Sequence, residues 1–298
     1  MALSNGTWRA RELGERTDLQ LRSGTVPYHE TGSGPPVVFV HGALVNANHW
    51  RKVVGPLSAD FRCVTLDLPL GAHPYPMGPD ADLTPPALAA LIAEAIEAIG
   101  LDAVTLVGND TGGALCQLLV TRRPERVDRL VLTSCDAFDN FPPKVMRPAL
   151  PLMKLPGSLP VLFAPMRLAA VRRRLMTLIR ATKRPVPLEV MDSYAHPALA
   201  SPGVRRDIRK LLRGLDPEYT VDAAERLRRF DRPTLIAWSR EDKFFPTAHA
   251  EQLAALLTDA RLEWIEDSYT FSPEDQPARL AELIADFARA PAVVGSTQ

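Results

Sequence analysis

The sequence is poor in cysteine, carries no net charge and contains no long apolar run. Its three cysteines, Cys63, Cys116 and Cys135, are odd in number, and each lies in an apolar stretch typical of a strand or helix. We therefore expect buried free thiols, not a disulfide framework or a metal site. Lysine plus arginine and aspartate plus glutamate both number 35, giving a formal net charge of zero. Bulk charge thus gives no support to general nucleic-acid or membrane binding.

Two further absences concern location. No apolar run approaches the ~18 residues of a transmembrane helix. The amino-terminal stretch "MALSNGTWRARELGERTD" has no apolar core of the signal-peptide type. We therefore expect a cytoplasmic protein, and nothing in the sequence suggests a cofactor.

Short apolar runs alternate with helical patterns along most of the chain. Six runs are β-branched or aromatic and continuously apolar, as parallel strands covered on both faces are: residues 36–42, 62–68, 103–109, 129–135, 233–239 and 261–267. Four helices are expected over residues 84–100, 112–123, 246–257 and 277–290. This alternation predicts a mostly parallel α/β sheet with right-handed crossovers, and residues 19–34 predict an antiparallel hairpin at its edge.

The alternation stops between residues 136 and 230, which are proline-rich and helical in pattern. Within this stretch, residues 161–180 and 204–215 look amphipathic. We interpret it as a helical cap inserted into an α/β core, over the carboxyl edge of the sheet. The expected organisation is therefore core (1–135), cap (136–230), core (231–290) and a disordered tail (291–298).

The run "GNDTGG" (108–113) joins a predicted strand to a predicted helix. Its small residues around Asp110 fit a nucleophile elbow, a sharp turn that presents its central side chain above the helix amino terminus, where backbone N–H groups favour an anion. The alternative is an ordinary glycine-rich turn in which Asp110 caps the helix.

Two other segments favour the elbow. "FVHGALVNANHW" (39–50) places His41-Gly42 at the end of an earlier strand, and "IAWSREDKFFP" (236–246) ends a later strand with Asp242. In this order the chain resembles the α/β-hydrolase superfamily over about residues 25–290. The aspartate at the elbow is similar to the haloalkane dehalogenase and epoxide hydrolase branch. The resemblance implies Asp110 as nucleophile, Asp242 as triad acid, and an oxyanion hole at Ala43 and Thr111.

The histidine that this branch uses to activate water is missing. It should follow the last strand in a segment like D-S-G-H-F-x-x-x-x-x-P, and here that segment is "EDSYTFSPEDQP" (266–277). By register with Phe271 and Pro277, the histidine position holds Thr270, whose hydroxyl cannot act as a general base near neutral pH. His73 follows a strand at the carboxyl edge and is the candidate substitute base, although a histidine beside a proline is usually only a turn residue.

The residues that would handle the leaving group differ from those of both related enzyme classes. Dehalogenases of this branch hold the halide with a tryptophan after the nucleophile and an amide or indole after the His-Gly, but this chain has Thr111 and Ala43 there. We therefore expect no useful dehalogenase activity. Epoxide hydrolases use two cap tyrosines, for which this cap offers Tyr194 and Tyr219, although two tyrosines in such a segment are also unremarkable.

The predicted cap is strongly basic. From Lys144 to Arg213 there are fifteen Lys/Arg and three Asp/Glu, so this stretch carries 15 − 3 = +12 in a chain that is neutral overall. Solvated faces of amphipathic helices explain this excess. An electropositive lid that attracts an anionic substrate, an acyl carrier or a membrane surface is the alternative.

Two functions remain open. The first is an enzyme that acts on a small, largely apolar molecule through Asp110, by a hydrolase-like reaction or by elimination, isomerisation or cyclisation. The second is a catalytically degenerate hydrolase-fold protein that binds such a molecule.

Overall fold

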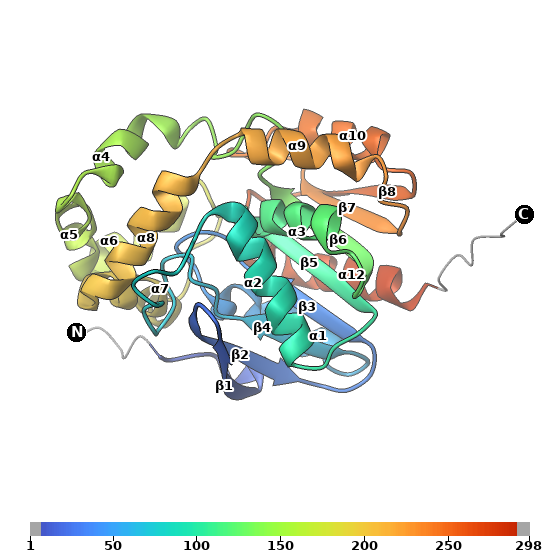
Figure 1. The fold of residues 1–298 in the computed structure, drawn as a ribbon, viewed down its shortest axis with the longest axis horizontal. Helices are drawn as coiled ribbons and strands as arrows, with labels where there is room; N and C mark the ends of the chain where they lie inside the picture. The colour runs from blue at the N-terminus through green and yellow to red at the C-terminus, as the bar shows by residue number, and fades with distance from the viewer. Residues whose placement is uncertain (1–6, 291–298) are drawn as a thin grey trace, which may run out of the picture.

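The structure is a computed structural model that describes residues 7–290. The predicted tail, residues 291–298, lies outside the described residues. An eight-stranded sheet runs through the molecule in the order β1-β2-β4-β3-β5-β6-β7-β8 (Figure 1). Its strands are β1 Glu15–Leu21, β2 Gly24–Thr31, β3 Pro36–Val40, β4 Arg62–Leu66, β5 Val104–Asp110, β6 Val127–Cys135, β7 Thr234–Ser239 and β8 Ala260–Ile265.

The strand directions match the sequence prediction. β1 pairs antiparallel with β2, and β2 pairs antiparallel with β4, whereas the other neighbouring pairs are parallel. The mostly parallel α/β sheet is therefore confirmed, with the hairpin at its edge. All six predicted strands form within a few residues of their predicted limits.

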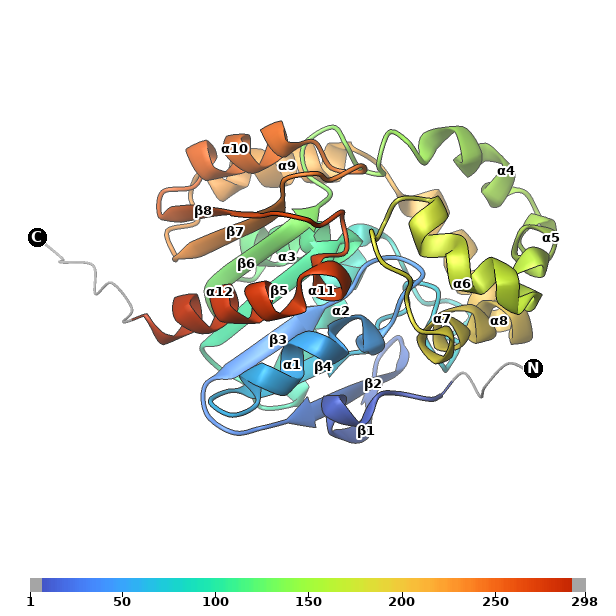
Figure 2. The same ribbon diagram turned by 180° about the vertical axis from the view of Figure 1, so that it is seen from behind.

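Helices cover both faces of the sheet (Figures 1 and 2). One face carries α2 (Pro85–Ala98), α3 (Thr111–Arg122), α9 (Glu218–Leu227) and α10 (Thr247–Leu256), and the other carries α1 (Arg51–Leu57) and α12 (Pro277–Arg289). Each face has its own apolar cluster because side chains alternate along a strand. In β3, Val38 and Val40 belong to the first cluster, and Val37 and Phe39 belong to the second.

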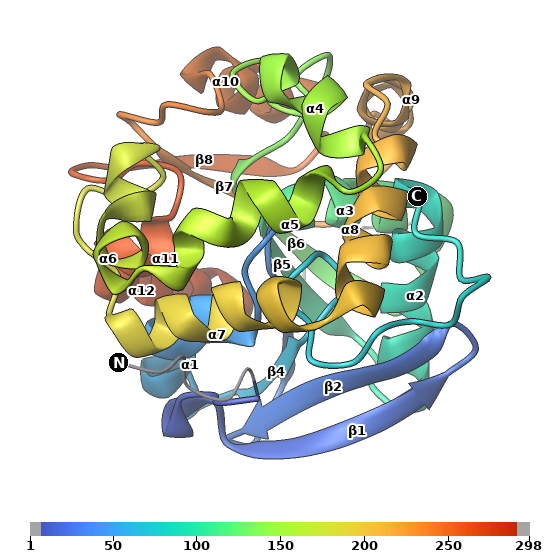
Figure 3. The ribbon, with the colours of Figure 1, turned by 90° about the vertical axis from the view of Figure 1, so that its left-hand side faces the viewer.

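A helical segment lies across one end of the sheet (Figure 3). It contains α4 Leu150–Lys154, α5 Ser158–Phe163, α6 Ala169–Leu178, α7 Leu188–Ala200 and α8 Pro202–Gly214, with short 3-10 helices η3 Arg147–Ala149 and η4 Ala164–Arg167. Its apolar side chains pack against loops that leave the carboxyl ends of the strands, through Leu44 after β3, Ala72 after β4 and Phe271 after β8. The segment therefore covers the carboxyl edge of the sheet.

One detail of the cap differs from the sequence prediction, and a second adds to it. The cap was expected to reach residue 230, but α9 packs on α3 and buries Ala223 and Leu227 in the core cluster, so the covering segment ends between Gly214 and Glu218. The amphipathic stretch 161–180, for which no helix limits were predicted, is divided between α5, η4 and α6. It divides at η4, where Pro165 lacks the backbone N–H that a continuous helix needs.

The remaining short elements are η1 Arg11–Leu13, η2 Ala47–Trp50 and α11 Ser272–Asp275. The three cysteines are buried and free, as predicted. Among residues 7–290, no helix combines the length and the apolar character that a membrane crossing requires.

Candidate active site

The elbow forms where β5 ends at Asp110 and α3 begins at Thr111. Asp110 has φ 56° and ψ −133°, outside the regions that an aspartate usually adopts. The small residues around it are required by close packing. A Cβ atom on Gly108 would overlap the Cys116 sulfur, and one on Gly112 would overlap the backbone of β3. Close packing therefore requires glycine on both sides of the strained residue.

The Asp110 side chain lies against the loop that follows β3. A Cβ atom on Gly42 would overlap the Asp110 carboxylate, so only glycine allows this approach. The backbone N–H groups of Thr111 and Ala43 face the carboxylate and lower its pKa. Burial acts more strongly in the opposite direction, and the nearby Asp242 adds to it, so the Asp110 pKa is raised to about 7. The two positions expected to form the oxyanion hole thus meet at Asp110.

Thr270, the residue predicted to stand at the histidine position, lies beside Asp242. Its hydroxyl donates a hydrogen bond to Asp242 Oδ1 over 2.8 Å. The same oxygen accepts the backbone N–H groups of Phe244 and Phe245, at 2.7 and 2.9 Å. These three donors fix the orientation of the Asp242 carboxylate. The side chain that hydrogen-bonds to it is an alcohol, which cannot take a proton from water near neutral pH.

A third carboxylate, Asp136, lies beside the elbow and was missed from the sequence. It follows β6, and the hydroxyl of Thr111 lies 3.4 Å from Asp110 Oδ1 and 3.3 Å from Asp136 Oδ2, between the two carboxyl groups. Asp136 is fully buried, and its Oδ1 has no hydrogen-bond partner among the described residues. Burial, and then the proximity of Asp110, raises the Asp136 pKa well above its usual value. The available signal was an aspartate directly after an apolar strand.

His73 does not serve this site in the structure. Its Nε2 lies 3.3 Å from Asp207 Oδ2 in α8, and its Nδ1 faces the Gly71 N–H at 3.3 Å. Both ring nitrogens thus face groups other than Asp110, and no hydrogen bond joins His73 to Asp110 among the described residues, so the structure gives no support to His73 as the substitute base. The loop around Gly71 turns the imidazole toward the covering segment, which the sequence does not reveal.

A different histidine, His49, contacts the elbow, but it does so at Asn109 and not at Asp110. His49 Nε2 lies 2.8 Å from Asn109 Oδ1, and the Asn109 amide donates to the carbonyl of Thr270 over 3.0 Å. Burial lowers the His49 pKa to about 4, which keeps the ring neutral. This connection fixes the backbone of the elbow and of Thr270, and it does not bring an imidazole to Asp110.

The two candidate tyrosines pack in different places. Tyr194 of α7 is buried with Val45 and Phe271, and its hydroxyl has no hydrogen-bond partner among the described residues. Tyr219 of α9 packs at the border of the core cluster on the α3 face. No hydrogen bond or ring contact joins the two tyrosines in the described part of the chain, so the structure does not assemble them as a pair.

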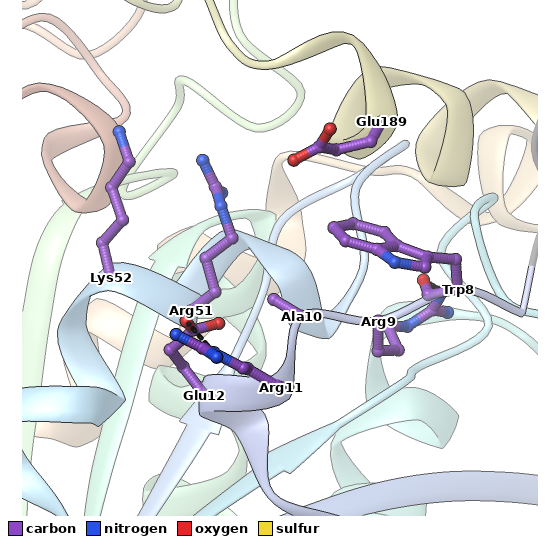
Figure 4. Close-up of a pocket in the computed structure, with 8 residues that line it drawn as sticks. All are labelled: Trp8, Arg9, Ala10, Arg11, Glu12, Arg51, Lys52 and Glu189. Atoms are coloured by element: carbon purple, nitrogen blue, oxygen red, sulfur yellow. Dashed lines mark hydrogen bonds and ion pairs between the residues drawn. The ribbon is translucent and has the colours of Figure 1, made fainter.

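The surface also contains a pocket of about 550 Å³ that is separate from the elbow (Figure 4). It is lined by Trp8, Arg9, Ala10, Arg11, Glu12, Arg51, Lys52 and Glu189. Its cations are already engaged by acids: Arg9 with Asp67, Arg11 with Glu12, and both Arg51 and Lys52 with Glu274. We therefore assign no reaction to it. No group of metal-ligating side chains occurs within residues 7–290.

Comparison with known proteins agrees with this geometry. The sequence pattern of the alpha/beta hydrolase fold family matches residues 35–277, which span the elbow, the loop after β3 and the Thr270 segment. The chain belongs to the α/β-hydrolase fold family.

Its relatives include hydrolytic enzymes. The chain is 28% identical over 271 residues to an uncharacterized protein of Mycobacterium tuberculosis, covering 86% of this chain and 76% of that protein. It is 26% identical over 276 residues to haloalkane dehalogenase 2 of the same organism, covering 88% and 91%. The crystal structure of haloalkane dehalogenase DbeA from Bradyrhizobium elkani superimposes with a TM-score of 0.75 at 22% identity, covering 91% and 96%, which is a likeness of fold.

Proposed function

We propose that this α/β-hydrolase is an enzyme that transforms a small, largely apolar molecule with Asp110 as its reacting group, and that it does so without histidine-dependent hydrolysis. The observation that carries the proposal is the hydrogen bond of Thr270 to Asp242 over 2.8 Å. This contact supports the proposal because the hydroxyl beside Asp242 cannot act as a base near neutral pH, while Asp110 keeps its strained position between β5 and α3.

The electrostatics of the site favour proton transfer by Asp110. A general acid or base works best when its pKa lies near the working pH, and the Asp110 pKa is raised to about 7. Asp136 is a second carboxyl group near Asp110, and burial raises its pKa as well. A pair of carboxyl groups that do not both ionise can give and take a proton, as an elimination or isomerisation requires.

The surroundings favour an apolar substrate. Loops beside the elbow contact the cap through Leu44 and Val45, which pack with Ile208 of α8 and Met176 of α6. A ligand held between the elbow and the cap would therefore replace apolar contacts.

Dehalogenation is disfavoured for this chain. Ala43 has no side-chain donor, and the Thr111 hydroxyl lies between two carboxyl groups, where a halide would meet negative charge. Loss of each donor to a developing anion costs about 3 kcal/mol in related chemistry.

The test is exposure of the protein to reactive epoxides and alkyl bromides, followed by intact-mass spectrometry. A stable adduct that is absent in Asp110→Asn would show a reactive carboxylate whose ester is not hydrolysed. Thr270→His should then convert this adduct to turnover. Rapid turnover by the unmodified protein, with halide or diol released, would contradict the absence of a base.

Proton transfer needs its own assay. Solvent-deuterium exchange into small apolar carbonyl compounds, followed by NMR, should occur with the unmodified protein and be lost in Asp110→Asn. A protein that shows neither adduct nor exchange, yet binds apolar ligands in calorimetry, would be a catalytically degenerate binding protein, the second candidate that the lack of a base allows.

A further inference from the structure

The outer part of the cap exposes an unusual amount of apolar surface. We call residues 144–180, which include η3, α4, α5, η4 and α6, the outer cap. Among the described residues, nine large apolar side chains are exposed, and eight of them lie in the outer cap: Val145, Leu152, Leu155, Val161, Leu162, Leu168, Leu178 and Ile179. Scattered exposed apolar residues are normal, but such a concentration in one segment marks an interaction surface.

The helices of the outer cap turn these side chains outward because their inner faces are already occupied. In α5, Leu159 and Phe163 are buried against the cap interior, while Val161 remains 72% exposed on the opposite side. In α6, Met176 is buried, and Leu178 is 71% exposed. A surface helix normally carries polar residues on its outer face, so α5 in particular lacks the expected solvent side.

The same segment is exclusively basic. Residues 140–188 contain no Asp or Glu and ten Lys/Arg: Lys144, Arg147, Lys154, Arg167, Arg172, Arg173, Arg174, Arg180, Lys183 and Arg184. Some of these are engaged, for example Arg172 with Asp192 and Lys183 with Glu241. Four others, Lys154, Arg167, Arg173 and Arg174, form no ion pair with a described residue, so their charges are available to a partner.

We propose that the outer cap docks on an anionic membrane surface, with its exposed apolar side chains entering the headgroup region and its cations facing lipid phosphates. Apolar side chains beside uncompensated lysine and arginine are the combination that holds a protein at an anionic lipid interface. A second copy of this chain fits the surface less well, because a symmetric contact would bring two all-basic segments together.

The location gives docking a consequence for the site. α4, α5 and α6 form the side of the cap that is turned away from the sheet, as Figure 3 shows from that side. A protein docked through them would have its covered sheet edge directed toward the bilayer, where small apolar molecules concentrate. The docking itself does not depend on the proposed chemistry of Asp110.

The test is co-sedimentation with vesicles of phosphatidylcholine alone or of equal parts phosphatidylcholine and phosphatidylglycerol. We expect binding to the anionic vesicles to be about tenfold or more tighter, and to weaken as salt is raised. Arg173→Glu/Arg174→Glu should abolish the preference for anionic vesicles. Val161→Asp/Leu178→Asp should reduce binding to both kinds, and since these positions are exposed, folding should be unaffected, as circular dichroism would verify.

Matched controls lie outside the outer cap. Arg228→Glu/Arg229→Glu reverses the same charge at exposed positions after α9, and Val221→Asp changes a 45% exposed apolar residue of α9. Both should bind vesicles as the unmodified protein does. Equal loss in the controls, or no binding to either vesicle, would overturn the proposal. The proposal would also be overturned if light scattering showed a dimer that Val161→Asp/Leu178→Asp dissociates, and if the unmodified protein did not bind vesicles.

Discussion

Buried carboxylates lie in opposite electrostatic environments in two regions of the molecule. Near the amino-terminal strands, Asp67 forms an ion pair with Arg9 over 2.8 Å and accepts the Ala47 N–H over 2.9 Å. Arg9 and His29 hold the Asp67 pKa well below its usual range despite burial. At the elbow, Asp110 and Asp136 lie close together with no ion pair to a described cation, and burial raises the pKa of both.

The contrast shows that buried carboxyl groups in this fold do not generally lack ion-pair partners. The chain pairs Asp67 with Arg9, and Glu274 with Arg51 and Lys52, whereas no cation among residues 7–290 forms an ion pair with Asp110 or Asp136. Uncompensated buried carboxyl groups lower stability, and perturbed pKa values of this kind gather at functional sites. The difference between the two regions therefore supports a chemical role for Asp110.

The largest effect is expected at Asp110. Asp110→Asn keeps the shape of the side chain but removes its nucleophilic and basic oxygen, so adduct formation and proton exchange should fall by about 100-fold or more. Intact-mass spectrometry and deuterium exchange measure the loss. Retained reactivity would mean that the elbow is not the reacting group.

Breaking the compensated region should cost stability instead. Asp67→Asn leaves the Arg9 charge facing an amide in a buried place, and the free energy of unfolding should fall by about 3–5 kcal/mol in urea titration. The control is Asp18→Asn, which removes an acid whose side chain is 39% exposed and should cost less than about 1 kcal/mol. A loss below about 1 kcal/mol for Asp67→Asn would remove the contrast between the two regions.

Asp136→Asn should raise the free energy of unfolding, whereas Asp67→Asn should lower it. Because the folded-state pKa of Asp136 is raised, folding retains a proton that the unfolded chain releases, and stability is lost as the pH rises from about 4. The amide cannot ionise, so the variant should be more stable than the parent by about 1–3 kcal/mol at pH 8 and nearly equal at pH 4. Urea titration at both pH values measures this. A variant that is less stable at pH 8 would show that Asp136 is ionised and well solvated.

The smallest effect is expected at Thr270. Thr270→Val removes the hydroxyl that donates to Asp242, which should lower the free energy of unfolding by about 1 kcal/mol. Thr270→Ser keeps the donor and should behave as the parent does. Equal stability of the two variants would mean that the hydrogen bond to Asp242 contributes nothing.

Periodic and spaced features were predictable from the sequence. The strands from β3 to β8 are continuous apolar runs, and the elbow follows from glycines that only close packing explains. The place of Thr270 followed from its fixed spacing to Phe271 and Pro277. It is consistent with the observed contact to Asp242.

Features that depend on loop direction were not predictable. Asp136 follows β6 immediately, but only the three-dimensional turn brings it to Thr111. His73 lies on the predicted edge, yet its loop directs the ring to Asp207. The end of the cap was misplaced because α9 has the same amphipathic pattern as a cap helix, and only its contact with α3 assigns it to the core.

The pairing of His73 with Asp207 has a mechanical consequence. Asp207 also accepts the Met77 N–H over 2.8 Å, and Lys210 of the same helix donates to the carbonyls of Pro79 and Ala81 over 2.6 Å. These hydrogen bonds fix α8 to the loop after β4, so this part of the cap should not move when the cap opens. Residues 181–184 after α6 are also fastened to the core, through Phe271 and Asp275. Any opening that admits a substrate should therefore begin at α4 and α5, which have no such hydrogen bonds to the described part of the core.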